Sequence, residues 1–254
     1  MSILQRYNNP LFAKQYDLSE QGSRHGDIEA YVRLLNKTKG PVLEIGCGTG
    51  RITVPLKKSG VDVMGLDLAQ EMIKLARAYA KRERQNIKFM VGDAVTFKLP
   101  KKFDAIIFPY NSIRQIPENK ISRLFKSVAR HLNPSGKFIF DFSQHTNTGK
   151  KDASFTPWSE PIAVTGTGFT LFRRMKRAED IKKQTWTITY EWKIQPKNST
   201  VIPRKTTMVF STRPTEWYAK QGVASGLAME KRKDIKVKSN HGQATHTVLI
   251  FRKK

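Results

Sequence analysis

The stretch VLEIGCGTGR, Val42–Arg51, decides how the rest of the chain is interpreted. It begins as a short apolar strand and runs directly into three glycines, Gly46, Gly48 and Gly50. Glycine at a turn between a strand and a helix permits positive φ and lets a ligand pack against the main chain. The N-terminus of the following helix presents free N–H groups and a partial positive charge, which suit an anion. The stretch therefore predicts a ligand-binding turn.

The spacing of these glycines separates two classes of ligand. A dinucleotide-binding fold uses G-x-G-x-x-G, whereas the three glycines here form G-x-G-x-G. The same strand carries Glu44 just before the turn. Because a buried acid is costly unless it holds a hydrogen-bond donor or a cation, we expect Glu44 either to hold an ammonium group or to tighten the turn.

Two further acids stand at the ends of the next two predicted strands. Asp67 ends the strand at 61–67, where a carboxylate can accept both hydroxyls of a ribose. Asp93 ends the strand at 86–93, where it can accept from an exocyclic amine such as that of adenine. Met72 either flanks a base or packs in the core. Each acid alone is also typical of a turn cap, but together they describe a ligand with an amino-acid end, a ribose and an adenine.

Apolar periodicity predicts alternating helices and strands up to about residue 144. After an irregular N-terminal stretch, helices are predicted at 24–37, 51–60, 69–82 and 118–132. Strands are predicted at 40–46, 61–67, 86–93, 103–110 and 136–142. Strands separated by helices imply a mainly parallel sheet covered on both faces, which is a Rossmann-like α/β layout.

From about residue 145 apolar and polar residues alternate, as in antiparallel strands with one solvated face. The pattern predicts strands at 168–178, 183–195 and 204–213, a helix at 214–222, and closing strands at 230–239 and 244–253. We therefore expect three parts. They are an N-terminal lid or helical segment (1–36), a seven-stranded Rossmann-like core (37–144 and 213–254), and a small antiparallel β lid after the fifth strand (145–212).

Four motifs in order, VLEIGCGTGR, GLDLAQEMIKLAR, IKFMVGDA and FDAIIFPYNS, resemble those of class I S-adenosylmethionine (SAM)-dependent methyltransferases. The resemblance covers about residues 12–143 and is to the small-molecule branch with a β-sheet lid. It implies SAM as cofactor, S-adenosylhomocysteine (SAH) as product, and methyl transfer to N or O of a small acceptor. One departure is Ala69, where the family usually has a capping Ser or Thr; we expect a weaker helix start but no loss of binding.

The resemblance also implies roles for individual residues. The glycines would face the methionine part, Asp67 the ribose, and Asp93 with Ala94 the adenine. The segment AKQYD resembles an N-terminal lid segment whose tyrosine closes over the cofactor. The expected cofactor-binding residues are Tyr16, Glu44, Gly46, Gly48, Gly50, Arg51, Asp67, Leu68, Met72, Asp93, Ala94 and Pro109.

Catalytic and substrate residues are less well defined, because methyl transfer from a sulfonium rests largely on alignment and on exclusion of water. Tyr110 and His145 are the candidate catalytic residues, although a lone histidine after a strand is more often an ordinary loop residue. Three lid aromatics share one face of a predicted strand and form either core or an acceptor pocket. The candidate substrate-binding residues are Asn111, Trp186, Tyr190 and Trp192.

Two further residues of the glycine stretch have limited roles. Arg51 either meets a carboxylate or is solvated. Cys47 has no evident activating base, so we expect no nucleophilic role for it. As the single cysteine it permits no disulfide framework and fits a reducing cytosol. No apolar run approaches the roughly 18 residues of a membrane helix, and the N-terminus lacks a signal core. We expect a cytoplasmic protein without a metal site.

The net charge of +25, with a pI near 10.2, suits polyanions such as nucleic acid, or serves solubility. Residues 145–254 hold 22 basic and 8 acidic residues, and residues 1–144 hold 24 and 13, so the excess is spread over both halves.

Three functions are compatible with these features: a small-molecule methyltransferase, a nucleic-acid (RNA) methyltransferase, and a SAM-binding protein without catalysis. The charge favours the second. However, enzymes that methylate base amino groups commonly carry Asp or Asn before Pro-Pro-aromatic, whereas FPYN at 108–111 has one proline and begins with Phe108. No RNA-binding module is recognisable in the sequence. A dinucleotide enzyme is a more distant alternative, and the acceptor atom and oligomeric state stay open.

Overall fold

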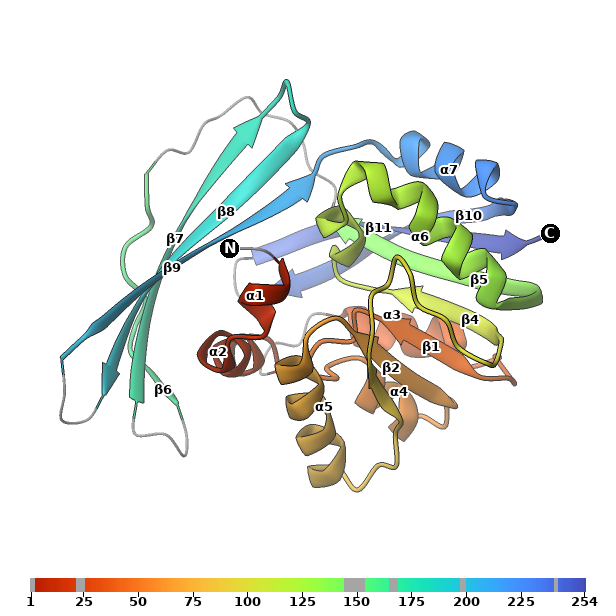
Figure 1. The fold of residues 1–254 in the computed structure, drawn as a ribbon. Helices are drawn as coiled ribbons and strands as arrows, with labels where there is room; N and C mark the ends of the chain where they lie inside the picture. Colours follow the sequence, from red (N-terminus) through yellow and green to blue (C-terminus); the bar gives the residue numbers. More distant parts are fainter. Residues whose placement is uncertain (1–2, 22–25, 144–153, 165–168, 197–199, 240–241) are drawn as a thin grey trace. The chain divides into compact units, whose positions relative to one another are not determined.

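The computed structural model describes residues 3–21, 26–143, 154–164, 169–196, 200–239 and 242–254 (Figure 1). The chain divides into two units, which are described separately. The larger comprises Tyr7–Gln144 and Pro214–Lys254, and the smaller comprises Met1–Arg6 and His145–Arg213. No helix within the described ranges is long and apolar enough to cross a membrane.

The larger unit is built on a seven-stranded sheet in the order β10-β11-β5-β4-β1-β2-β3. Neighbours from β3 to β5 pair in parallel, and β11 runs antiparallel to both β5 and β10. The predicted Rossmann-like, mainly parallel seven-stranded sheet is therefore confirmed. The strands are β1 (Val42–Ile45), β2 (Val63–Asp67), β3 (Phe89–Val91), β4 (Phe103–Phe108), β5 (Leu132–Ser143), β10 (Leu227–Ser239) and β11 (Gly242–Lys253).

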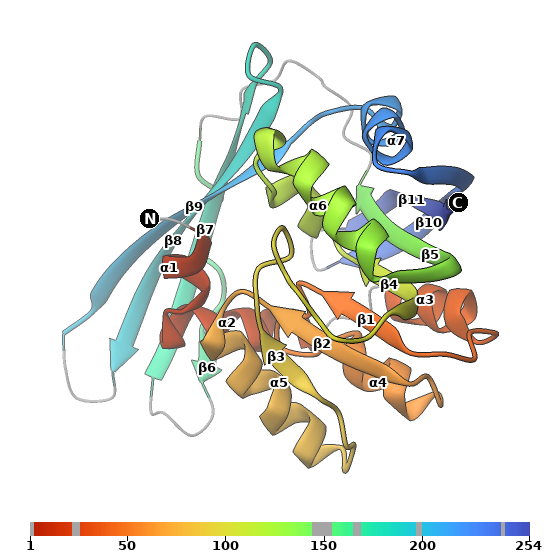
Figure 2. The same cartoon turned by 45° about the vertical axis from the view of Figure 1, so that its right-hand side comes forward.

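Helices cover both faces of this sheet (Figures 1 and 2), because strands of a parallel sheet are apolar on both sides. One face packs against α3 and α4, and the other against α6 and α7. A fifth helix, α5, packs beside α4 and against β3. The bounds are α3 (Asp27–Leu35), α4 (Thr53–Lys58), α5 (Gln70–Arg82), α6 (Glu118–His131) and α7 (Thr215–Ala224), with a 3-10 turn η1 (Ser112–Gln115).

The N-terminal stretch, expected to be irregular, is helical. It forms α1 (Ile3–Tyr7) and α2 (Pro10–Gln21), so that expectation is wrong. The cause is local: the Asn9 side-chain oxygen accepts the Phe12 N–H at 3.1 Å, and proline takes the first position of α2.

The smaller unit contains a four-stranded antiparallel sheet in the order β6-β7-β8-β9. Three of its strands match the predicted ones, whereas β6 was not predicted. Arg6 of α1 donates a hydrogen bond to the carbonyl of Thr207 in β9. The strands are β6 (Ile162–Val164), β7 (Phe169–Asp180), β8 (Thr185–Pro196) and β9 (Ile202–Ser211).

Candidate active site

The three glycines after β1 adopt the positive φ that their spacing predicted. Gly46, Gly48 and Gly50 have φ of 65°, 55° and 83°. A Cβ at Gly46 would lie 2.7 Å from the Phe108 ring, so packing at the end of β4 requires glycine there. At Gly48 a Cβ would meet no atom of the described chain within 4 Å. The main chain at Gly48 therefore borders open space, as a ligand that packs on the backbone requires.

Asp67, at the end of β2, holds this turn in place. Its Oδ2 accepts the Gly48 N–H at 2.8 Å, and its Oδ1 accepts the Ala69 N–H at 2.9 Å. Burial raises the pKa of Asp67, while the N–H groups of Ala69, Gly48 and Leu68 act against that rise. One carboxylate thus fixes both the glycine turn and the start of α5.

The start of α5 is supported from the N-terminal segment. Ala69 makes no side-chain capping bond, as its residue type predicts. Instead the Asn8 side-chain oxygen accepts the Glu71 N–H at 3.3 Å. Tyr16 of α2 and Met72 of α5 lie in one apolar cluster with Ala69. Two residues expected to bind cofactor, Tyr16 and Met72, are therefore brought together beside the end of β2.

Glu44 is buried beneath the glycine turn, with 3% of its surface exposed. Its Oε2 accepts the Thr53 hydroxyl at 2.5 Å, which ties β1 to α4. Burial raises the pKa of Glu44 to about 8, although Thr53 and Arg51 act against the rise. A cation placed against this carboxyl group would favour its charged form.

This shift predicts a pH dependence of stability. The pKa of Glu44 rises from 4.5 to about 8 on folding, so the folded chain binds one proton more than the unfolded chain between these pH values. The free energy of unfolding should fall as pH rises through this window, by up to about 1.4 kcal/mol per pH unit from this group. Glu44→Gln should remove that contribution. Urea unfolding at pH 5, 6.5 and 8 measures it, and parallel pH profiles of the two proteins would contradict the assignment.

Arg51, directly after the last glycine, is committed to a protein carboxylate rather than solvated. Its two terminal nitrogens donate to Asp27 of α3 at 2.9 and 2.6 Å, and both side chains are buried. The guanidinium also lies 4.6 Å from the centre of the Tyr110 ring. Burial alone would lower the pKa of Arg51, but the charge and hydrogen bonds of Asp27 raise it overall. The pair ties α3 to the glycine turn.

Another buried carboxylate, Asp141 of β5, has three polar partners. Its Oδ1 accepts the Tyr31 hydroxyl at 2.6 Å and the Tyr110 N–H at 2.9 Å. Its Oδ2 lies 2.6 Å from Nδ1 of His246 in β11. A carboxylate at Nδ1 fixes which ring nitrogen carries the proton and leaves Nε2 as the acceptor. Asp141 and His246 therefore form a paired acid and imidazole beside Tyr110.

Tyr110 and Asn111 hold the end of β4 in a rare conformation. Their φ values are 58° and 61°, which side-chain-bearing residues seldom adopt. The Asn111 N–H donates to the Asp141 carbonyl at 3.2 Å, and its Oδ1 accepts the N–H of Ser143 at 2.8 Å. Residues held in such conformations cluster at active and ligand-binding sites, where neighbouring contacts keep them in place. The strand ends of β4 and β5 are joined at this point.

The remaining expected cofactor residues lie at the same edge of the sheet. Asp93 caps the turn after β3, its Oδ1 accepting the Val95 N–H at 2.8 Å. Ala94 packs against the core beside it, and Pro109 is buried after β4. Cys47 is buried, which raises the pKa of its thiol, in keeping with no nucleophilic role. The described residues contain no group of three or more acids, histidines or cysteines placed to hold a metal ion.

The expected substrate aromatics belong to β8 in the smaller unit. Trp186 stacks on Phe210 at 4.6 Å between ring centres, and Tyr190 lies 5.7 Å from Trp192. Trp186 and Trp192 are buried. His145 lies outside the described residues.

Sequence reasoning missed four residues that the structure places around Tyr110 and the glycine turn: Asp27, Tyr31, Asp141 and His246. One signal was present, because Asp141 interrupts the apolar strand KFIFDF at 137–142, and a buried acid needs partners.

Comparison with known proteins agrees with this geometry. A family model described as "Methyltransferase domain" matches residues 42–136. YqeM of Bacillus subtilis, which is named a methyltransferase, is 26% identical over 179 residues, covering 69% of this chain and 72% of that protein. The chain covers 46% of the length of some other curated relatives.

Two solved structures share the fold. A SAM-dependent methyltransferase from Clostridium acetobutylicum has a TM-score of 0.73 at 16% identity, covering 96% of this chain and 98% of that one. The sugar N-methyltransferase KedS8 from Streptoalloteichus has a TM-score of 0.72 at 18% identity, covering 94% and 90%. These matches show a methyltransferase domain at residues 42–136, on a fold shared with SAM-dependent methyltransferases.

Proposed function

We propose that the chain transfers a methyl group from SAM to a nitrogen or oxygen of a small-molecule acceptor. The observation that carries the proposal is the glycine turn, which Asp67 holds beside open space at Gly48. The fold likeness to a sugar N-methyltransferase supports a small, hydroxylated amine as the acceptor class.

The residues at this edge of the sheet suit the three chemical parts of SAM. Glu44, buried beneath the glycine turn, would hold the α-ammonium group, whose positive charge favours the carboxylate form. The carboxylate of Asp67 would hold the ribose hydroxyls, and the turn at Asp93 the adenine. The bare main chain from Gly46 to Gly50 allows close approach of the methionine part. SAM, when bound, supplies an activated methyl group on a sulfonium.

We further propose that His246 takes the acceptor's proton. The buried carboxylate of Asp141 at Nδ1 holds the imidazole in one orientation and stabilises the imidazolium that forms. The Asp141 carboxylate also holds the Tyr110 main chain, so one group positions both the base and the end of β4. In this proposal Tyr110 lines the site, and His246 rather than Tyr110 is the general base.

Asp67→Ala should weaken SAH binding roughly 5- to 150-fold, a loss of about 1–3 kcal/mol, since it removes a ribose acceptor and leaves the Gly48 N–H without its partner. Asp62→Ala is the matched control, because Asp62 is exposed and lies just before β2. Calorimetric titration of both variants measures the effect. An SAH dissociation constant unchanged in Asp67→Ala would contradict the assignment of the ribose site.

The acceptor class is tested by incubating the protein with SAM and amino sugars, phenols or RNA, and measuring SAH formed. SAH production with an amino sugar or phenol supports the proposal. Turnover with RNA alone would replace it with the nucleic-acid alternative.

A further inference from the structure

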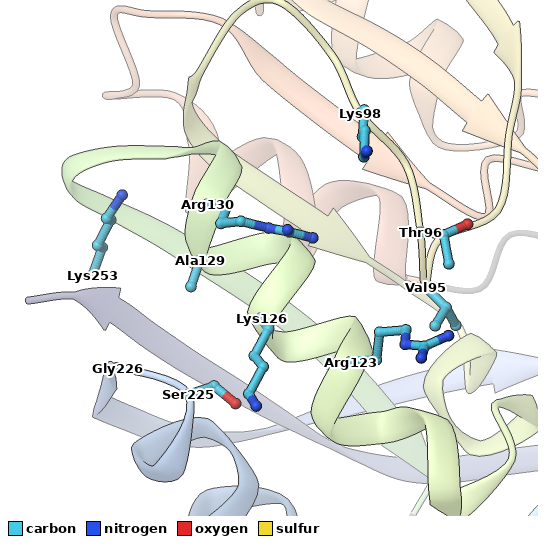
Figure 3. A pocket seen from close by; sticks show the side chains of 10 residues that line it. All are labelled: Val95, Thr96, Lys98, Arg123, Lys126, Ala129, Arg130, Ser225, Gly226 and Lys253. Carbon is cyan, nitrogen blue, oxygen red and sulfur yellow. The ribbon is translucent and has the colours of Figure 1, made fainter.

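A basic groove lies on the larger unit, apart from the glycine turn, along the outer side of α6 (Figure 3). Its volume is about 690 Å³. We call it the α6 groove; its basic residues are Lys98, Arg123, Lys126, Arg130 and Lys253. None of the residues that line it belongs to the candidate active site.

Three elements bring these cations together. Arg123, Lys126 and Arg130 follow one another at spacings of three and four, which places them on one face of α6. The opposite face of the helix is buried in the core. Lys98 comes from the segment between β3 and β4, and Lys253 from the end of β11. In Figure 3 the Arg123 side chain points toward the β3–β4 segment, and Lys126 points toward the turn before β10.

The positive charge of the groove is not balanced within the described part of the chain. Arg130 donates to the Ser127 hydroxyl at 3.2 Å and Lys253 to the Leu132 carbonyl at 2.9 Å, both neutral acceptors. Arg123, Lys126 and Lys98 form no ion pair with a described acidic residue. Burial and the charge of Lys102 lower the pKa of Lys253, which agrees with a positive local potential. A bound polyanion would relieve this mutual repulsion.

We propose that the α6 groove binds the phosphate backbone of a nucleic-acid strand. Its two apolar side chains are Val95 and Ala129, and among the described residues no aromatic ring lines the groove to stack on a base. Contacts would therefore be to phosphates and independent of base sequence. A concave row of cations fits a chain of phosphates better than the flat surface of a membrane. This binding does not depend on the proposed methyl transfer.

Fluorescence anisotropy with a labelled single-stranded 12-mer RNA tests the proposal. If each of the five cations contacts one phosphate, the logarithm of the binding constant should fall with the logarithm of salt concentration with a slope of roughly −3.5. The double variant Arg123→Glu/Lys126→Glu should bind at least about 10-fold more weakly, with the slope reduced by about 1.4. Charge-conserving Arg123→Lys/Lys126→Arg should bind like the original protein.

The control is Lys37→Glu/Lys39→Glu, which changes two exposed lysines outside the groove by the same charge. SAH affinity and the thermal unfolding temperature should be unchanged in all three variants. A loss of RNA binding can then be assigned to the groove rather than to unfolding or to damage at the cofactor site. Equal loss of RNA binding in the control would overturn the proposal, because diffuse charge would then explain it. Binding of inorganic triphosphate or of phosphatidylserine vesicles in place of RNA would also overturn it.

Discussion

His246→Gln is expected to lower kcat roughly 100-fold or more, because the variant loses the group that takes the acceptor's proton. Glutamine keeps a polar group that can reach Asp141, so the buried carboxylate retains a partner. The SAH dissociation constant should stay unchanged, since His246 lies on β11 and its hydrogen bond is to Asp141 of β5. The measurement is SAH production under saturating acceptor, together with calorimetric SAH binding.

Two further variants separate a base from a structural residue. Asp141→Asn should also lower kcat, because an amide stabilises an imidazolium far less than a carboxylate does. Tyr31→Phe removes another hydrogen bond to the same carboxylate at 2.6 Å and should leave kcat within a few-fold of the original. A similar loss of kcat in all three variants would mean that the hydrogen-bond network only supports the fold. An unchanged kcat in His246→Gln would show that His246 is not the base.

Asp27→Ala is expected to lower the free energy of unfolding by about 3–5 kcal/mol, because it leaves the buried guanidinium of Arg51 without its carboxylate. Asp27 is fully buried and its partner is 8% exposed, so water replaces little of the lost interaction. Urea denaturation followed by circular dichroism measures the change.

The double variant Asp27→Ala/Arg51→Met provides the matched control, since removing both charges should recover most of the lost stability. Glu83→Ala, which breaks the exposed pair with Lys58, should change stability by less than about 1 kcal/mol. A single-variant effect of Asp27→Ala as small as that of Glu83→Ala would contradict the structural role assigned to the buried pair.

The strands of the parallel part of the sheet and the glycine turn were predictable because their signals are local. The apolar run before Gly46 and the G-x-G-x-G spacing give both the strand and the positive φ. The N-terminal helices were also encoded locally, in Asn9 and Pro10, but that signal was overlooked. Gly222 misled in the other direction, because α7 was predicted to end there. The helix continues past it to Ala224. Glycine is required at 222 for packing, because a Cβ there would lie 2.3 Å from the Phe251 ring.

The buried polar network could not be predicted from local patterns. Asp141 and His246 are 105 residues apart and meet only because β11 pairs with β5. Asp27 and Arg51 meet because α3 packs beside α4, whose start follows Arg51 in the chain. Such pairings depend on register between distant elements, which periodicity within one segment does not determine. The glycine turn is local and was predicted, whereas the residues proposed for proton transfer are brought together by the tertiary fold.

Calorimetric titration of the purified protein with SAH, with NADH titrated in parallel, tests whether the glycine turn is a SAM site. We expect one SAH site of micromolar affinity and no NADH binding. Absence of SAH binding, or binding of NADH in its place, would contradict it.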